Sequence, residues 1–192
     1  MSGICGYVGS APEGVLDAML AQIDYRGDSS EKLVTADVGF GYRWWRGRPG
    51  KSPGVYQQGT QLAVCAGAFA PAVSSPAEML PRLWDDSTQT LTSVDGAFAG
   101  AWWDGDRKRL ALIRDPFGVR SLYYTEHAGV FYFASELKQL LAIPGLPIEL
   151  DRVALHKYLT FSFVPGEDVP VRGIRRLLPG HSAIWHDGKL QR

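Results

Sequence analysis

The sequence AFAGAWWDGDRKRLALIR, residues 97–114, decides the fold class of this chain. It holds two apolar runs, Ala97–Trp103 and Arg109–Arg114, joined by the polar tripeptide DGD at 104–106. Aspartate and glycine between two apolar runs are a strong signal for a tight turn, so this stretch predicts a β-hairpin. A hairpin pairs its two strands antiparallel, and that pairing is the first indication of the fold class.

A second hairpin is predicted directly after the first. Its strands are Leu122–Tyr124 and Val130–Ala134, with the turn at His127–Gly129. Towards the end of the chain, Arg172–Trp185 predicts an extended strand pair, and Asp187-Gly188 predicts one more tight turn. Adjacent hairpins with few helices between them favour antiparallel sheets over a doubly wound parallel sheet.

The rest of the chain predicts further strands and several helices. Three more strands are expected in runs of small and apolar residues: Gly3–Gly9, Val38–Tyr42 and Leu62–Phe69. The Gly- and Pro-rich stretch Arg46–Gly54 is expected to be a loop. A helix is expected to open at Pro12, since the next apolar residues share one helical face: Val15, Leu16, Met19, Leu20 and Ile23. Three later helices are predicted at Pro76–Trp84, Glu136–Leu141 and Leu150–Leu159, the last with Asp151 placed to cap it.

Small residues are dense in the predicted strands at 63–70 and 97–101, which suits sheets that pack closely face to face. The fold class predicted is therefore α+β, with mainly antiparallel sheets. The length of 192 residues fits one domain covering residues 1–192, and there is no internal repeat.

Composition and charge exclude several classes of function. The formal net charge is zero, which gives no field to attract nucleic acid or an acidic membrane surface. No apolar run approaches the roughly 20 residues of a membrane span, and a secretory signal is not evident. The two cysteines, Cys5 and Cys65, form neither a disulfide framework nor a metal-ligand spacing with the four scattered histidines. A cytoplasmic domain that binds no metal is expected.

Ser2 is a candidate nucleophile because it becomes the first residue when Met1 is removed. A free α-amino group has a pKa near 8, so it can act as a base towards a side chain beside it. The alternative is that Ser2 is only a small residue that favours removal of Met1. The residues alone leave both interpretations open.

The heptapeptide RDPFGVR, residues 114–120, is the most distinctive string in the chain. Pro116 fixes its own φ, and Gly118 permits a φ that other residues avoid, so a rigid turn is predicted. Arg114, Asp115 and Arg120 are expected to hold this turn by ion pairs. An architectural role is favoured over a functional one.

Several motifs together resemble those of the asparagine synthetase family, from residue 2 to the end of the chain. The strongest are RDPFGVR at 114–120 with LYY at 122–124, and FASELK at 133–138. The others are SGICGYVG at 2–9, YRGD at 25–28, DGAFA at 95–99 with WD at 103–104, and PGH at 179–181. Spacing or composition alone would not have indicated this family.

The resemblance implies a fold and a partner. It implies an αββα sandwich of two mainly antiparallel sheets flanked by helices, as in class II glutamine amidotransferases of the N-terminal-nucleophile hydrolase type. The family's second domain activates a carboxylate with ATP through an S-G-G-x-D-S loop, which is not in this sequence. No cofactor is therefore expected in this domain, and ATP and magnesium are expected of a synthetase domain or chain that is its partner.

The sequence departs from the family at the positions that would hydrolyse glutamine. Ser2 stands where the family has its nucleophilic cysteine, and a hydroxyl is a weaker nucleophile than a thiol. The family's oxyanion motif aligns with Ala66-Gly67-Ala68-Phe69, in which Gly67 remains but Ala66 has no amide to donate. The arginine that binds the substrate carboxylate falls at Trp44, with Arg43 able to substitute after a shift of register. Asp95 matches the carboxylate that holds the substrate amine.

The resemblance leaves two main hypotheses of function, and a third is a free-standing binding domain that is stable without a partner. The first is a non-hydrolysing glutaminase-like domain of an amide ligase, either macrolactam-forming like the lasso-peptide cyclases or similar to the β-lactam synthetases. Its substrate is then a precursor peptide or a small molecule. The alternative is a working glutaminase that uses Ser2, or Cys5 exposed by removal of residues 1–4. Under the first hypothesis, we expect four aromatic residues to lie near the surface and to contact the partner domain: Trp44, Trp45, Phe161 and Phe163.

Overall fold

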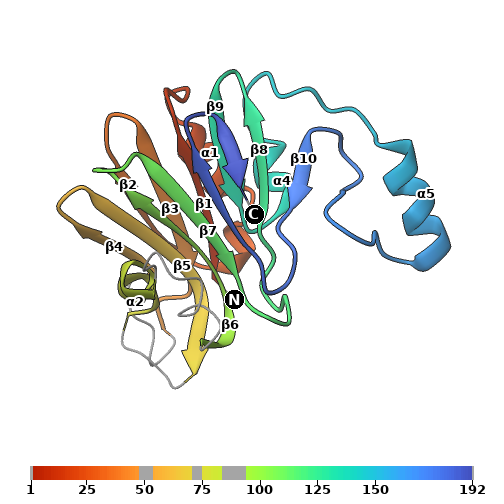
Figure 1. Ribbon diagram of the computed structural model, residues 1–192. Coiled ribbons are helices and arrows are strands. Elements are labelled where there is room, and N and C mark those ends of the chain that lie inside the picture. Colours follow the sequence, from red (N-terminus) through yellow and green to blue (C-terminus); the bar gives the residue numbers. More distant parts are fainter. Residues whose placement is uncertain (1, 48–53, 71–74, 84–93, 192) are drawn as a thin grey trace.

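The computed structural model describes residues 2–47, 54–70, 75–83 and 94–191, and it shows two antiparallel sheets packed face to face (Figure 1). Each sheet has six strands among these residues. Helices cover the outer faces of both sheets, which gives four layers. The predicted αββα sandwich is confirmed.

The first sheet contains the N-terminal strand at its centre. Its strand order is β10-β8-β9-β1-β3-β2. The strands are β1 (Gly3–Val8), β2 (Ser29–Val34), β3 (Val38–Trp44), β8 (Tyr123–His127), β9 (Val130–Ala134) and β10 (Ile174–Arg176). Strand β1 pairs with β3 on one side and with β9 on the other, so its backbone is hydrogen-bonded on both sides. The sequence did not predict β2, an edge strand in which every second residue is exposed or nearly so.

The second sheet is built around the hairpin from which the fold was predicted. Its strand order is β12-β11-β7-β6-β5-β4. The strands are β4 (Val55–Gln58), β5 (Gln61–Ala70), β6 (Asp95–Asp104), β7 (Arg109–Arg114), β11 (Ser182–His186) and β12 (Lys189–Gln191). The predicted hairpin is β6–β7, with Asp104 opposite Arg109. Strand β4 was not predicted; it is short, mostly polar, and defined by its pairing with β5.

One prediction about topology was wrong. The stretch Arg172–Trp185 was expected to form a strand pair, but its two strands lie in different sheets. Strand β10 pairs with β8 in the first sheet, and β11 pairs with β7 in the second. Each strand adds to an edge left free by a hairpin, and those edges belong to different sheets. The turn at Asp187-Gly188 is confirmed by the pairing of His186 with Lys189 across it.

The helices flank the sheets as the apolar patterns predicted, with shifted ends. Helix α1 (Val15–Ala21), the 3-10 turn η1 (Asp24–Arg26) and the short α4 (Leu137–Leu140) lie with the first sheet, and α2 (Pro76–Leu83) lies on the second. Helix α1 begins three residues after Pro12, behind a turn. The predicted end of α2 at Trp84 is outside the described residues.

Helix α5 (Arg152–Phe161) projects from the side of the sandwich beyond β10 (Figure 1). Asp151 caps it as predicted, because its carboxylate accepts hydrogen bonds from the amides of Val153 and Ala154 at 2.9 and 3.0 Å. Leu150 was expected to be helical, but it forms a bridge with Val171 instead. No helix in the described part of the chain is long and apolar enough to cross a membrane.

The core has three apolar layers, and strand alternation assigns each residue of β1 to one of them. Ile4 belongs to the layer between the two sheets, together with Phe40 and Tyr42 of β3. Cys5 belongs to the layer under α1. Even-numbered residues of this strand therefore face the space between the sheets, and odd-numbered residues face the helices. The same alternation places the side chain of Ser2 on the face of Ile4.

Candidate active site

Ser2 lies directly before β1, with only 2% of its surface exposed. Alternation places its side chain on the same face as Ile4, towards the space between the sheets. The Tyr42 phenol from β3, which is 4% exposed, is its neighbour. Burial raises the pKa of Tyr42, and a hydrogen bond with the Ser2 side chain opposes that shift. The two hydroxyls therefore form a contact inside the sandwich.

A network of side chains holds the main chain at Ser2. The Arg26 guanidinium donates to the Ser2 carbonyl oxygen at 3.0 Å. Its Nε forms an ion pair with Glu136, and the Tyr25 hydroxyl donates to the same carboxylate. Lys138 completes the network, with Nζ 3.7 Å from Glu136 Oε2 and 4.0 Å from the centroid of the Tyr25 ring. The sequence identified residues 25–28 and 133–138 as motifs. It did not predict that they meet, because they lie far apart in the chain.

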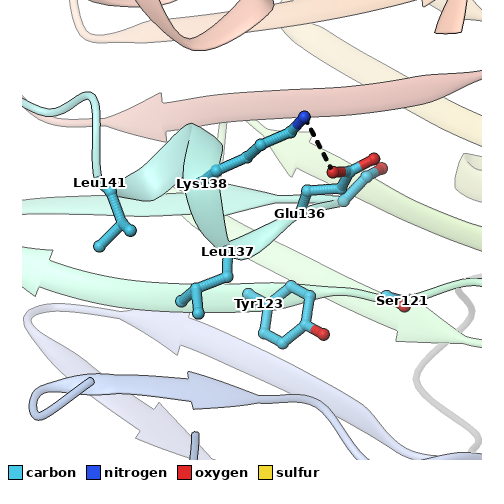
Figure 2. A pocket seen from close by; sticks show the side chains of 7 residues that line it. Ser121, Tyr123, Glu136, Leu137, Lys138 and Leu141 are labelled. Carbon is cyan, nitrogen blue, oxygen red and sulfur yellow. Dashed lines mark ion pairs between the residues drawn. The ribbon is translucent and has the colours of Figure 1, made fainter. Parts of the chain in front are cut away.

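A pocket of about 370 Å³ lies beside this network. Its walls come from the start of β8, from the segment between β9 and α4, and from α4 and its end: Ser121, Tyr123, Ser135, Glu136, Leu137, Lys138 and Leu141 (Figure 2). The pocket adjoins β1, because the Ser135 hydroxyl accepts from the Ile4 amide at 2.9 Å and the Ser135 amide donates to the Ile4 carbonyl at 2.9 Å. Ser135 and Glu136 thus belong both to the pocket wall and to the support of the N-terminal strand.

Across the sandwich, β5 presents Ala66 to the same interior layer as Ile4 and Tyr42. Ala66 is 1% exposed, and its methyl group offers no hydrogen bond. The next residue, Gly67, has φ 117°, and a Cβ there would lie 1.9 Å from the Ala97 carbonyl oxygen. No other residue fits that position without moving β6. The part of the site contributed by β5 is therefore apolar.

The two predicted substrate-binding residues, Asp95 and Arg43, lie in different sheets and bond to backbone groups. Asp95 is exposed at the first position of β6, opposite Ala70, and its carboxylate accepts from the Gly96 amide at 2.7 Å. Arg43 lies on the helix side of β3, where it donates to the Gly27 carbonyl at 2.8 Å and the Leu20 carbonyl at 3.3 Å. These two bonds occupy its Nε and one terminal nitrogen.

Trp44 is on the opposite face of β3 from Arg43, with Tyr42. Its indole stacks on the Tyr42 ring at a centroid distance of 5.0 Å and an interplanar angle of 18°. It also packs against the apolar layer between the sheets. Ser2 and Trp44 therefore both lie against Tyr42, and Trp44 places an aromatic ring at the position that the resemblance assigns to a carboxylate-binding arginine.

The turn at 114–120 is held by hydrogen bonds to backbone groups rather than by the expected ion pairs. The Arg114 guanidinium donates to the carbonyl oxygens of Arg120, Leu177 and Gly118 at 2.5, 2.6 and 2.8 Å. The Asp115 carboxylate accepts from the amides of Phe117, Val119 and Arg120 at 3.1, 2.9 and 2.9 Å. The rigid turn is confirmed; the expected ion pairs were wrong, because the side chains of Arg114 and Asp115 bond backbone groups instead.

The two cysteines are buried in separate layers of the core. Cys5 is fully buried in β1 beneath α1, and burial raises its pKa well above the usual range. Cys65 is 1% exposed beneath α2, and burial raises its pKa to about 12. Neither thiol is ionised near neutral pH, and a protonated thiol is a poor nucleophile. Cys5 and Ser2 point to opposite faces of β1.

Comparisons with known proteins agree with this architecture. Residues 60–192 match the family described as glutamine amidotransferase domain. The chain is 28% identical to asparagine synthetase (glutamine-hydrolyzing) 1 of Bacillus subtilis strain 168, over 97% of this chain and 34% of that protein. The chain thus spans about a third of that relative's length.

Two solved structures share the fold across 98% of this chain and 48% of theirs. One is the allosteric regulatory enzyme of purine biosynthesis, with a TM-score of 0.67 and 14% identity. The other is glutamine phosphoribosylpyrophosphate amidotransferase from B. subtilis, with a TM-score of 0.57 and 15% identity. At such low identity these likenesses establish the fold alone.

Proposed function

Because this chain belongs to the glutamine amidotransferase domain family, we propose that it is a non-hydrolysing, glutaminase-like domain of an ATP-dependent, asparagine-synthetase-type amide ligase. One observation carries the proposal: the Ser2 hydroxyl lies beside the Tyr42 phenol, and β5 presents the methyl group of Ala66 to the same interior layer as Tyr42. Hydrolysis of an amide needs an activated nucleophile and donors aimed at the developing oxyanion. This set of side chains supplies neither a thiol nor an amide donor.

The expected loss of rate is large. Removing one oxyanion donor costs about 100- to 1,000-fold in turnover. A serine in place of cysteine adds to that loss, since a thiol is already a few per cent ionised at neutral pH and a hydroxyl is not. Trp44 also stands where a carboxylate-binding arginine is expected. The changes at Ser2, Ala66 and Trp44 thus affect nucleophilic attack, stabilisation of the oxyanion and binding of the substrate carboxylate.

The test is glutamate release from glutamine by the purified chain with Ser2 as its first residue. We expect turnover below about 0.1 per second, far under the median enzyme rate of about 10 per second. The variant Ser2→Cys with Ala66→Asn is the matched comparison, because it restores a thiol and an amide donor on the same scaffold. Turnover of the unmodified chain above that limit would contradict the proposal.

The alternative is a working glutaminase, which the name of the Bacillus subtilis relative favours. It uses Ser2, or Cys5 after removal of residues 1–4. The second route is opposed by the packing, because cleavage before Cys5 removes Ser2 and Ile4, which Arg26 and Ser135 bind. We expect intact mass spectrometry to show loss of Met1 alone. A mass lacking residues 1–4 would favour the alternative.

Within the ligases, we propose the kind in which the amine comes from the substrate itself. Such an enzyme is macrolactam-forming, like the lasso-peptide cyclases, or is similar to the β-lactam synthetases, and it does not need ammonia from glutamine. The ATP and magnesium chemistry then belongs to a synthetase domain, with a precursor peptide or small molecule as substrate. Incubation of this domain and that synthetase with ATP should give amide product without glutamine. A requirement for glutamine or ammonia would contradict this step.

A further inference from the structure

A second cavity, of about 280 Å³, lies where three turns meet at the end of the sandwich opposite Ser2. The turns join β2 to β3, β4 to β5 and β6 to β7. Strand β3 runs from Val38 at this cavity to Trp44, which lies against Tyr42. A strand rises about 3.3 Å per residue, so about 20 Å separates the cavity from the Ser2 site. The cavity is therefore distinct from the candidate active site.

The floor of this cavity is apolar. Val38, Leu62 and Trp103 line it at 1–5% exposure, and all three belong to the layer between the sheets. Leu62 and Trp103 lie opposite each other across β5 and β6. The volume is close to the lower end of known small-molecule sites, about 300 Å³. A small ligand with an apolar group would place that group on this floor and so remove it from water.

The rim of the cavity is held by contacts between its turns. The Thr60 hydroxyl and the Asp106 carboxylate are hydrogen-bonded at 2.9 Å, which ties the β4–β5 turn to the β6–β7 turn. Gly105 brings these turns close together, because a Cβ there would lie 2.5 Å from the Thr60 carbonyl oxygen. On the other side, the Asp37 carbonyl accepts from the Gly9 amide at 2.7 Å. The backbone of the rim is thus preformed, which lowers the entropy lost on binding.

Lys108 extends its cation over the apolar floor. Its Nζ lies 6.0 Å from the centroid of the Trp103 ring, and its φ of 51° is in the left-handed region, which residues other than glycine rarely adopt. Its carbonyl oxygen accepts from His186 Nδ1 at 3.1 Å, which helps to hold that conformation. The preceding residue, Arg107, pairs with Asp104 at 3.6 Å instead. Of these two neighbouring cations, only Lys108 lines the cavity.

Asp37 brings the opposite charge to the same cavity. Among the residues that the structure describes, neither Asp37 nor Lys108 forms an ion pair, with each other or with a third residue. Opposite charges that line one cavity without pairing are too far apart to bond directly, which leaves room for a ligand between them. The chemistry of the cavity therefore matches a ligand with an anionic group, a cationic group and an apolar part.

We propose that this cavity binds a free α-amino acid with an apolar side chain. Lys108 binds the carboxylate and Asp37 binds the ammonium group, each by a charge-assisted hydrogen bond. The side chain of the amino acid packs on the floor formed by Val38, Leu62 and Trp103. The site uses no residue of the candidate active site, so it does not depend on whether glutamine is hydrolysed.

The test is calorimetric titration of the whole chain with L-phenylalanine, 3-phenylpropionate and phenethylamine, which share a ring and differ in charge. We expect L-phenylalanine to bind with a Kd of about 1 mM or below. The other two ligands should bind about fivefold more weakly, since each lacks one of the two charged groups. L-Serine, which has both charges but no apolar side chain, should also bind more weakly than L-phenylalanine.

Two variants separate the roles of the charges. Lys108→Met should weaken binding of L-phenylalanine about fivefold and leave phenethylamine binding unchanged. Asp37→Asn should weaken L-phenylalanine to a similar degree and leave 3-phenylpropionate unchanged. Both side chains are exposed, so the melting temperatures should stay within about 2 °C of the parent's. The matched control is Arg107→Met, which removes the neighbouring cation that pairs with Asp104 and should change no Kd.

Two results would overturn the proposal. One is the absence of L-phenylalanine binding at about tenfold above the expected Kd. The other is L-phenylalanine binding that neither Lys108→Met nor Asp37→Asn weakens, because such binding would lie elsewhere on the chain. Neither result bears on the release of glutamate from glutamine, so this inference and the proposed function are tested separately.

Discussion

At the scale of single residues, position on a strand face decides chemistry more than residue type does. Cys5 is the better nucleophile by type, yet it is buried under α1 with its pKa raised, while Ser2 faces the interior beside Tyr42. Arg43 and Trp44 are adjacent in sequence, but the Arg43 side chain lies on the helix side of β3 and the Trp44 ring lies on the opposite face with Tyr42. A register shift of one residue exchanges such faces completely.

Burial of the two thiols predicts an alkaline loss of stability. The folded state keeps both thiol protons, whereas the unfolded state releases them above a pKa of about 8.5. The free energy of unfolding therefore falls as pH rises above that value, by about 1.4 kcal/mol per pH unit for each thiol. Urea unfolding between pH 8 and 9.5 measures the slope. Cys65→Ser should reduce this slope by the contribution of one thiol. An unchanged slope would show that burial of the Cys65 thiol does not cause the loss of stability.

At the scale of elements, the β7–β8 turn is the rigid part that joins the two sheets. Asp115 is fully buried and accepts three amide hydrogen bonds, and Arg114 donates to three carbonyl oxygens. One of those carbonyls, that of Leu177, lies just after β10, so the turn is also tied to the return of the chain. The element thereby fixes the backbone at Arg120, whose amide and carbonyl are both bonded within the turn.

We predict that Asp115→Ala destabilises the chain by about 3 kcal/mol, because it leaves buried amides without an acceptor and each charged hydrogen bond is worth about 1.5–3 kcal/mol. Equilibrium unfolding in urea measures the change. Asp17→Ala is the matched control: it removes an exposed carboxylate paired with Lys32, and should cost at most about 1 kcal/mol. Similar losses for the two variants would show that the Asp115 hydrogen bonds do not hold the turn.

At the scale of the whole molecule, apolar side chains gather on α5 and the segment after it. Tyr158, Leu159, Phe161 and Phe163 are 51–74% exposed. Trp45, which directly follows β3, is 40% exposed. The predicted exposure of Phe161, Phe163 and Trp45 is confirmed, whereas Trp44 is half-buried against Tyr42. Exposed apolar patches of this kind usually meet a partner.

We predict that α5 docks on the ATP-binding synthetase domain of the proposed ligase. Leu159→Asp with Phe161→Asp should weaken that association by about tenfold or more, because interdomain contacts of 600–1,500 Å² depend on their central apolar residues. Both residues are exposed, so the variant's own melting temperature should stay within about 2 °C of the parent's. Sedimentation and thermal melts with and without the synthetase domain measure this. A monodisperse monomer that the synthetase domain does not stabilise would contradict the prediction.

The sequence by itself determined the features that depend on near neighbours. The β6–β7 hairpin, the turn at 114–120 and the Asp151 cap each rest on a few consecutive residues whose backbone preferences agree. Only the tertiary structure decided that β10 and β11 join different sheets and that Arg26 and Glu136 meet. Those contacts join residues far apart in the chain, and they depend on strand order and on which face each strand buries, which local preferences do not specify.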